Sequence, residues 1–261
     1  MAKTALITGG SSGLGYALSE ILGKSGYRII IVARDQEKIN SSVDQLKKMN
    51  IETKGYSCDT TDEKGLKTVF EAVKSEYGKI DFLVLNAGVV TTALVSDYSD
   101  TTLLKRDLDI DLWGTILSAW QFLPLMEGGS QILMISSGFG LMGAAGYSMY
   151  CAAKAGIINF AEAFRRELLK KKIFVYVACP GDMDTPQFHA EMKNSPAWMK
   201  KTTPRKLMKT SVVAGKILKQ CKGSRKFLII PSGDVKLLAT VSKLVPRKFR
   251  DFLLDNMFPQ P

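Results

Sequence analysis

The chain has 261 residues, 46% hydrophobic and 23% charged, with a formal net charge of +11 and four widely spaced cysteines that form no CxxC pair. This length suits one α/β domain, since doubly wound sheets commonly form units of ~200–250 residues, and the cysteines predict neither a metal site nor a disulfide framework. No run of about 18 apolar residues is present, so we expect no membrane-spanning helix.

Short apolar runs alternate with amphipathic stretches of helical length along most of the chain. Such alternation predicts βαβ units and a doubly wound parallel sheet of about seven strands, with helices on both faces. No repeat, low-complexity tract or linker interrupts it, so we expect a single domain over residues 1–261. The predicted strands are residues 4–8, 28–33, 52–57, 81–86, 131–136, 174–179 and 226–231.

The first predicted strand follows Met1 almost at once, so we expect no signal peptide, and it runs into a glycine-rich turn that opens a helix. Glycines permit a tight turn and the close approach of a pyrophosphate, and the free N–H groups at the helix start attract its negative charge. The turn therefore predicts a dinucleotide site. Its residues are Thr8, Gly9, Ser11, Ser12, Gly13, Leu14 and Gly15.

The end of the second strand bears on the choice of dinucleotide. An NAD enzyme carries an acidic residue there to bind the adenosine ribose, but this sequence has Ala33 with Arg34 beside it. An arginine next to a missing carboxylate suits a 2′-phosphate, which predicts NADP(H). The alternative, NAD(H), stays open because a strand end shifted by one residue would bring Asp35 into the decisive place.

Further motifs follow along the chain. They are "CDTTD" with Asp59, "NAG" at Asn86, Ala87 and Gly88, "MISSG" with Ser137, Tyr150 and Lys154 in a YxxxK pattern, and "PGDMDT" with Pro180, Gly181 and Thr185. In this order and at these spacings the chain resembles the short-chain dehydrogenase/reductase family over residues 4–185. The resemblance implies a Rossmann-type fold and an NAD(P)-dependent oxidoreductase. It also implies that the cofactor is contacted by Asp59, Asn86, Ala87, Gly88, Tyr150, Lys154, Pro180, Gly181 and Thr185.

Tyr150 and Lys154 lie four residues apart, so on a helix their side chains converge. A phenol with an ordinary pKa of ~10 is a poor proton shuttle near neutrality, and a neighbouring ammonium is expected to lower that pKa. The resemblance implies that Tyr150 protonates a carbonyl oxygen, that Ser137 hydrogen-bonds the same oxygen, and that Lys154 also holds the nicotinamide ribose. We therefore expect a carbonyl reductase that uses NADPH.

One residue departs from the family pattern. On the preceding helix the family has an asparagine, a fourth catalytic residue that anchors a water relay to the lysine, whereas "DIDLWG" has Asp111. A carboxylate cannot donate as an amide does, and it would pair with Lys154 if it pointed inward. A shifted pH optimum or a slower enzyme is the expected consequence; a non-catalytic dinucleotide-binding sensor or scaffold is the alternative.

Residues 182–210 are rich in Pro, Met, Lys and aromatic residues, and a long irregular segment of this kind is typical of a substrate lid. "DMDTPQF" resembles the corresponding stretch of 3-ketodihydrosphingosine reductases, which implies a long-chain 3-oxo amine as substrate. Asp182 and Asp184 could attract that amine, and Phe188, Met192 and Trp198 are candidate substrate residues. The competing substrate is a 3-oxoacyl thioester of fatty-acid metabolism.

Positive charge gathers toward the C-terminus, where 16 of the 36 Lys and Arg residues but only 4 of the 25 Asp and Glu residues follow His189. The bias predicts an anionic partner, such as cofactor phosphates, an acidic carrier or an anionic membrane surface. Nucleic acid is disfavoured, since no basic groove motif with aromatic residues accompanies the charge.

Residues 235–258 mix apolar and basic side chains, and such a segment can lie in a membrane interface or dock on the sheet or on a second subunit. We expect a cytoplasmic protein, with peripheral membrane contact through this segment as an option. The family resemblance implies a homodimer or homotetramer, built on the helix that carries Asp111 and the helix that begins near Tyr150.

Overall fold

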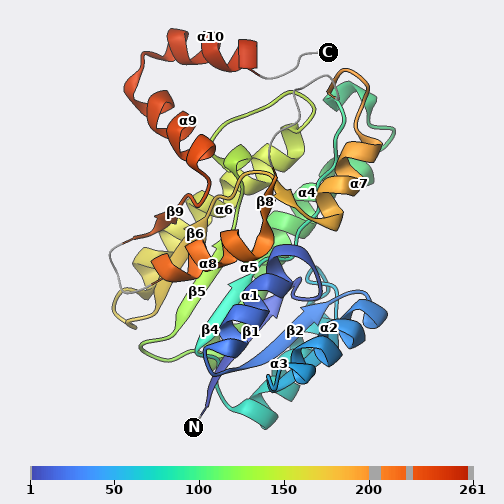
Figure 1. The fold of residues 1–261 in the computed structure, drawn as a ribbon, viewed down its shortest axis with the longest axis vertical. Coiled ribbons are helices and arrows are strands. Elements are labelled where there is room, and N and C mark those ends of the chain that lie inside the picture. Colours follow the sequence, from blue (N-terminus) through green and yellow to red (C-terminus); the bar gives the residue numbers. More distant parts are fainter. Residues whose placement is uncertain (1, 200–206, 222–225, 258–261) are drawn as a thin grey trace.

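The structure is a computed structural model that describes residues 2–199, 207–221 and 226–257 (Figure 1). Its centre is a parallel sheet of seven strands in the order β3-β2-β1-β4-β5-β6-β9, which confirms the predicted doubly wound sheet. The order reverses between β1 and β4. The strands are β1 (Lys3–Thr8), β2 (Tyr27–Ala33), β3 (Thr53–Ser57), β4 (Phe82–Leu85), β5 (Gln131–Ile135), β6 (Phe174–Ala178) and β9 (Leu228–Ile229).

Helices cover both faces of the sheet, and the alternation of side chains along each strand divides the core in two. Leu6 and Ile30 point to one core with helices α3 (Glu63–Tyr77), α5 (Gly114–Phe122) and α6 (Ser148–Leu168). Ile7 and Ile31, one residue further along, point to the other with α1 (Gly13–Lys24), α2 (Gln36–Lys48) and α8 (Thr210–Gln220). Burial on both faces explains why the strands are almost continuously apolar.

The helical run between β4 and β5 changes its winding midway. After the short 3-10 turn η1 (Val95–Asp97), helix α4 (Thr101–Asp107) passes into a π-helical turn, η2 (Leu108–Trp113), and then into α5. Within this turn Asp111 is buried while Trp113 faces outward. Two further 3-10 turns, η3 (Leu123–Leu125) and η4 (Gly138–Gly140), flank β5. Such π-helical turns occur often at functional sites, and this one carries Asp111 inward.

The segment over residues 182–210 is more regular than the sequence indicates. Strand β7 (Met183–Asp184) pairs with β8 (Met208–Lys209), and helix α7 (Pro186–Asn194) lies between them in sequence. The helix begins there because the Thr185 side chain accepts a hydrogen bond from the Phe188 N–H, while Pro186 suits the first helical position. The expectation of a wholly irregular segment was therefore wrong for residues 186–194. Residues 200–206 of the expected lid lie outside the described part of the chain.

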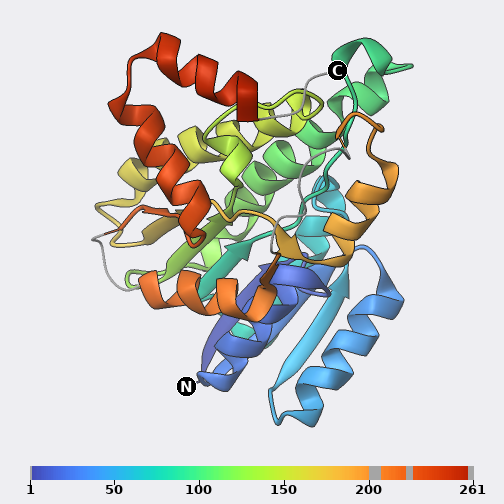
Figure 2. The ribbon, with the colours of Figure 1, turned by 45° about the horizontal axis from the view of Figure 1, so that its top comes forward.

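The chain ends in two helices, α9 (Gly233–Leu244) and α10 (Arg247–Met257), which we call the C-terminal arm. Figures 1 and 2 show α9 leading away from the sheet after β9, and α10 turning in a new direction at the end of α9 that is farther from the sheet. The base of the arm is fixed, since the Gly181 N–H donates to Ser232 Oγ at 2.9 Å. None of the helices in the described residues is both long and apolar enough to span a bilayer. Residue 258, the last of the expected interfacial segment, lies outside the described chain.

Candidate active site

A cleft of about 320 Å³ opens at the carboxyl ends of the strands, beside the point where the strand order reverses. Ligands of open α/β sheets bind at this position. Most of the residues that the sequence singles out line it, although they come from seven separate segments. They are Gly9, Ser11, Ser12, Gly13, Leu14, Arg34, Asp59, Asn86, Ala87, Gly88, Ser137, Tyr150, Lys154, Pro180, Gly181, Thr185 and Phe188.

Thr8 and Gly15 lie outside the lining and support it from behind. Thr8 Oγ1 accepts hydrogen bonds from the N–H groups of Asn86 and Ala87 at 3.0 and 3.2 Å, which joins the ends of β1 and β4. A Cβ on Gly15 would lie 2.2 Å from the carbonyl oxygen of Gly9, so only glycine lets α1 pack this closely on the turn. Both residues shape the cleft without lining it.

Met192 and Trp198, expected against the substrate, also lie outside the lining of the cleft. Trp198 belongs to a small apolar cluster with Tyr147 and Met199 instead. Its ring lies 3.1 Å from where a Cβ on Gly146 would stand, so it packs on the loop before α6. Of the three candidate substrate residues, Phe188 alone lines the cleft.

The glycine turn fits a pyrophosphate. Gly9 has a φ of +66°, and a Cβ there would lie 2.8 Å from Asn86 Nδ2, so this position requires glycine. Helices α2 and α3 begin with aspartate side chains that accept their first N–H groups, but the side chain of Ser12 makes no such bond at the start of α1. The first-turn N–H groups of α1 are thus left for an anion in the cleft.

The end of β2 agrees with the placement made from the sequence. The strand ends at Ala33, and Asp35 caps α2 by accepting the Lys38 N–H at 3.1 Å. Arg34 lines the cleft, with its Nη1 3.8 Å from Asp59 Oδ2, and Lys38 lines the same part. Two cations therefore stand where a 2′-phosphate would bind. Asp35 also lines the cleft, where its carboxylate caps α2 and lies 3.1 Å from Lys38 Nζ.

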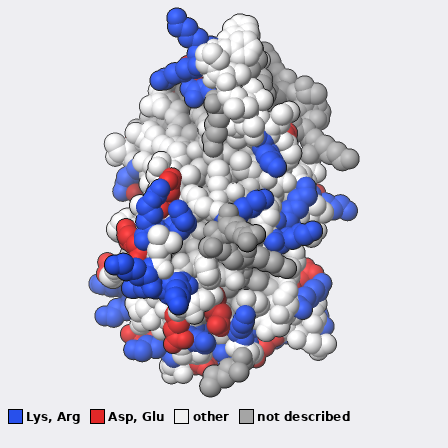
Figure 3. Space-filling model, turned by 90° about the vertical axis from the view of Figure 1, so that its left-hand side faces the viewer, with Lys and Arg blue, Asp and Glu red and all other residues white. Residues whose placement is uncertain are grey.

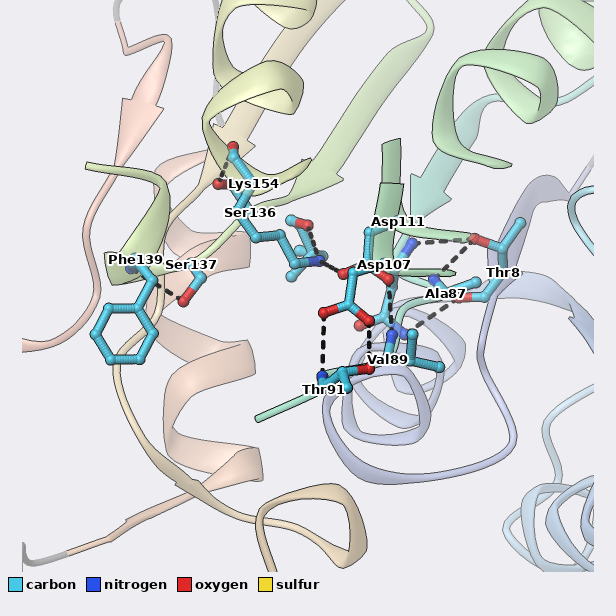
Figure 4. Close-up of polar contacts among 12 residues, drawn as sticks. Thr8, Ala87, Val89, Thr91, Asp107, Asp111, Ser136, Ser137, Phe139 and Lys154 are labelled. Atoms are coloured by element: carbon cyan, nitrogen blue, oxygen red, sulfur yellow. Dashed lines mark hydrogen bonds and ion pairs between the residues drawn. The ribbon is translucent and has the colours of Figure 1, made fainter. Parts of the chain in front are cut away.

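Lys154 is buried on α6 and held from two sides (Figure 4). Its Nζ lies 2.9 Å from Asp111 Oδ2 and donates to the Ile135 carbonyl oxygen at 3.3 Å. The same Nζ lies 5.4 Å from the centre of the Tyr150 ring. Ser137 Oγ accepts the Phe139 N–H at 3.2 Å, which fixes its side chain at the start of η4. Asp111 points inward, and it makes the pair with Lys154 that the sequence made conditional on this orientation.

Asp111 is anchored as firmly as the lysine it faces. Its Oδ1 accepts the Val89 N–H at 2.7 Å, and Asp107, one turn earlier, accepts both the N–H and the hydroxyl of Thr91 (Figure 4). A Cβ on Gly88 would lie 3.2 Å from both carboxylate oxygens of Asp111. The loop after β4 therefore passes directly over the ion pair, and glycine makes that approach possible.

The protonation of Tyr150 differs from the expectation. Burial raises its pKa to about 12; Lys154 lowers the pKa, but Asp111 raises it again. Asp111 also helps to raise the pKa of Lys154, although burial alone would lower it. The argument from the sequence counted the ammonium and missed both the burial and the opposing carboxylate, which act on the phenol in the same direction.

Two residues that the sequence did not single out, Tyr147 and Glu191, also line the cleft. The Tyr147 hydroxyl donates to Glu191 Oε1 at 2.5 Å, and its ring stacks on Phe139 with centroids 4.6 Å apart. Burial raises the pKa of Glu191 to about 7, and the charge of Asp182 adds to the effect. The only feature of the sequence that could have pointed to Tyr147 is its position one helical turn before Tyr150.

The two aspartates expected to attract an amine are separated. Asp182 lines the cleft, but Asp184 lies outside the lining, with its Oδ1 2.7 Å from His189 Nε2 and both side chains largely exposed. Asp182 lies just before β7, whereas Asp184 is the last residue of that strand. Glu191, and not Asp184, lines the cleft together with Asp182.

Comparison with known proteins agrees with this geometry. Residues 3–196 match the family model for short chain dehydrogenase. The human 3-oxoacyl-[acyl-carrier-protein] reductase is 31% identical over 188 residues, covering 71% of this chain and 77% of the relative. Carbonyl reductase family member 4 of Xenopus laevis is 30% identical over 187 residues, covering 71% and 77% of the two chains.

Solved structures extend the likeness to the whole fold. A variant of actinorhodin polyketide ketoreductase, solved with NADPH, has a TM-score of 0.79 at 25% identity and covers 90% of this chain and 97% of its own. A short chain dehydrogenase from Burkholderia cenocepacia J2315, solved with NADP, shares the fold with a TM-score of 0.80 at 22% identity, over 90% and 98% of the two chains. The chain therefore belongs to the short chain dehydrogenase family.

Proposed function

We propose that this protein is an NADPH-dependent ketoreductase that reduces the 3-oxo group of a long-chain lipid, such as 3-ketodihydrosphingosine. Family membership makes the chain an NAD(P)-dependent oxidoreductase; the direction, the preferred cofactor, the site residues and the substrate are what we propose. The observation that carries the proposal is the convergence of Ser137, Tyr150 and Lys154 on the cleft that the glycine turn also lines.

The residues present fit NADPH. The turn at Gly9 and the uncapped start of α1 would hold the pyrophosphate, and Arg34 with Lys38 would hold the 2′-phosphate. The nicotinamide, when bound, supplies the hydride. Two of the similar solved proteins were crystallised with NADPH or NADP, which supports the same cofactor here.

The chain's own residues supply and stabilise the proton. The Tyr150 hydroxyl donates its proton to the carbonyl oxygen as negative charge develops there. Ser137 Oγ already accepts the Phe139 N–H, so its own O–H is left to donate to the same oxygen. Lys154 uses two of its three N–H donors on Asp111 and Ile135, and the third is available toward Tyr150 and a ribose hydroxyl.

The protonation state of Tyr150 favours reduction over oxidation. Reduction of a ketone needs a proton donor, and burial keeps the phenol protonated by raising its pKa to about 12. Oxidation of an alcohol would need the phenolate, which the same burial and the nearby Asp111 disfavour. We therefore assign Tyr150 the role of general acid.

The lining of the cleft supports an amine beside the ketone. Asp182 and Glu191 are acidic, and Phe139 and Phe188 add apolar surface near them. Carboxylates attract an ammonium group and repel an anionic one. The names of similar proteins favour a second candidate, a 3-oxoacyl thioester, whose acidic carrier would meet the basic C-terminal quarter of the chain.

The test is oxidation of NADPH and NADH by the purified protein with three ketones: 3-ketodihydrosphingosine in mixed micelles, a 3-oxoacyl thioester and a short alkyl ketone. We expect NADPH-dependent turnover of the sphingoid ketone above the others. Preferred turnover of the thioester would transfer the assignment to the second candidate. Bound NADPH without turnover of any ketone would identify a cofactor-binding protein that has lost catalysis.

Tyr150→Phe is the matched control for the chemical step. It removes only the hydroxyl, so turnover should fall about 10²–10⁴-fold while the affinity for NADPH, measured by its fluorescence, stays near that of the native chain. Full activity in this variant would refute the role of Tyr150 as general acid.

A further inference from the structure

We propose that the C-terminal arm, α9 and α10, is a membrane-binding element that lies on an anionic lipid surface. Large apolar side chains on the arm are open to solvent: the exposed fractions are 67% for Leu237, 80% for Leu244, 52% for Phe249 and 62% for Phe252. Several large apolar side chains exposed on one element mark a candidate interaction site in a folded protein. This inference does not depend on the identity of the ketone substrate.

The apolar residues are arranged by face. Leu237 and Leu244 are seven residues apart, two turns of α9, so they share its outer side. On the inner side Ala239 is buried, and Val235 packs where Cβ atoms on Gly138 and Gly181 would stand. Helix α9 thus uses one side for packing on the body of the protein and leaves the opposite side uncovered within the described chain.

Basic residues accompany this apolar face. Arg247, Lys248 and Arg250 flank Phe249 in sequence in the first turn of α10. Asp251 pairs with Arg247 at 3.6 Å and with Arg250 at 2.8 Å, so one carboxylate is shared between these two cations. Figure 3 shows Lys and Arg side chains gathered at the end of the molecule where the arm lies, next to a surface of uncharged residues. Apolar side chains set beside cationic ones are the pattern of helices that lie in the interface of a bilayer, where the cations meet lipid phosphates.

Charge complementarity favours lipid over a second copy of the chain. In a two-fold contact between two arms, the same surface meets itself, and the basic residues around Phe249 would face their own copies. Helices α9 and α10 together carry five basic and three acidic residues, so the net charge of the arm is positive and two copies of it repel each other. An anionic lipid surface attracts the same residues while it buries the leucine and phenylalanine side chains.

The arm also connects the proposed membrane surface with the cleft. Ser232, just before α9, accepts the N–H of Gly181, and Val235 packs on Gly138, the residue after Ser137. Gly181 lines the cleft. An arm lying on a bilayer would therefore hold this side of the cleft near the lipid, where a long-chain ketone dissolves.

The experiment is co-sedimentation of the full-length protein with vesicles of phosphatidylcholine alone and of phosphatidylcholine mixed with phosphatidylglycerol. We expect binding to the mixed vesicles, with weaker binding as salt is raised and little binding to the neutral ones. Absence of binding to the mixed vesicles at low salt would overturn the proposal.

Two double variants of the arm test its apolar and its basic side chains separately, and each is compared with a control outside the arm. Leu244→Asp combined with Phe252→Asp should weaken vesicle binding about a hundredfold, because two buried apolar side chains are lost. Val212→Asp combined with Met49→Asp, which adds the same charge at exposed apolar sites outside the arm, should bind as the native chain does. Equal binding by the arm variant and its control would refute the assignment of the arm.

Arg247→Gln combined with Lys248→Gln should weaken binding to the mixed vesicles about fivefold for each charge removed. Lys47→Gln combined with Lys48→Gln on α2 is the control of equal charge. Melting temperature and NADPH affinity, measured on every variant, show that the body of the protein is intact. If the arm variants change the oligomeric state and the native chain does not bind vesicles, the surface is an interface between copies and the proposal fails.

Discussion

Arg34 is the residue on which the proposed choice of cofactor depends. It follows the last residue of β2 directly and lines the cleft with more than half of its side chain exposed. Arg34→Asp exchanges the cation for a carboxylate that can accept hydrogen bonds from ribose hydroxyls, so we expect NADH to become the preferred cofactor. The loss of a charged phosphate contact should lower kcat/KM for NADPH by about tenfold or more.

The measurement is kcat/KM for both cofactors at one fixed ketone concentration. Lys47→Asp, on the exposed surface of α2, changes the net charge by the same amount and should leave the preference unaltered. Unchanged NADPH selectivity in Arg34→Asp would show that another group, with Lys38 the first candidate, carries the 2′-phosphate.

Asp111 affects Tyr150 through the field of a buried ion pair. Its charge raises the pKa of Tyr150, whereas Lys154 lowers it. Asp111→Asn removes the negative charge and leaves the ammonium, so the pKa of Tyr150 should fall. Reduction needs the protonated phenol, and activity is lost as the pH rises through its pKa; the alkaline limb of the rate profile should therefore move to lower pH.

Rate profiles from about pH 6 to about pH 11 measure this shift. Loss of the counter-charge should also destabilise the fold by about 3–5 kcal/mol, since Lys154 remains buried without its partner. Asp107→Asn is the control: it disturbs a buried carboxylate that bonds Thr91 and should lower stability without moving the alkaline limb. Superimposable profiles for the native chain and Asp111→Asn would contradict the electrostatic role.

At the scale of elements, α7 is held beside the cleft by two polar contacts. Glu191 accepts the Tyr147 hydroxyl from the start of α6, and Ser195, just after α7, donates to Thr92 at 3.3 Å. The first contact titrates, because burial raises the pKa of Glu191 to about 7 from its ordinary value of 4.5. The stability of the fold is therefore expected to depend on pH through Glu191.

The sign of this coupling follows from linkage. Between about pH 4.5 and pH 7 the folded chain holds a proton on Glu191 that the unfolded chain releases. This contribution to stability is complete below about pH 4.5, falls as the pH rises, and is lost above about pH 7. Glu191→Gln cannot titrate and can still accept the Tyr147 hydroxyl, so it should lack this dependence.

Denaturant unfolding at about pH 5 and about pH 8 tests the coupling. The native chain should lose on the order of 2 kcal/mol more stability between these values than Glu191→Gln does. Comparison of the two chains removes the contribution of all other titrating groups. The same pH dependence in both would show that Glu191 ionises normally in the folded state.

The elements differ in how far the sequence predicts them. Six of the seven strands of the main sheet lie where continuous apolar runs occur, because burial on both faces favours apolar residues at every position. The exception is the edge strand β3, whose sequence TKGYS is mostly polar and only partly buried. Helix α7 was missed, although Phe188 and Met192 stand four residues apart, because it has only nine residues and its start depends on the Thr185 cap and Pro186. The position of Asp111 in its motif suggested a pair with Lys154 only if its side chain pointed inward, and the sequence alone did not decide that orientation. The contact between Tyr147 and Glu191 joins residues 44 positions apart, and no local pattern encodes it.

At the scale of the whole molecule, one exposed surface remains to be explained. Trp113 and Trp120 are both more than half exposed, two helical turns apart around the start of α5, and Leu103 on α4 is exposed as well. Large aromatic side chains on one helix face are typical of an interface between subunits. This surface belongs to the helical run that carries Asp111, the run from which the sequence predicts a homo-oligomer.

Trp120→Asp should therefore dissociate the predicted homo-oligomer. In a two-fold contact each substitution occurs twice, so the variant loses two tryptophan anchors and can bring two carboxylates together. Loss of such an anchor should raise the dissociation constant about thirtyfold or more, which size-exclusion chromatography with light scattering would register as a monomer. Val212→Asp on α8 adds the same charge at another exposed apolar residue and should leave the mass unchanged. A native chain that is already monomeric, or a variant with the native mass, would mean that α5 faces something other than a second copy. Dissociation should also lower turnover, because η2 packs against Gly156 of α6, the helix that carries Tyr150 and Lys154.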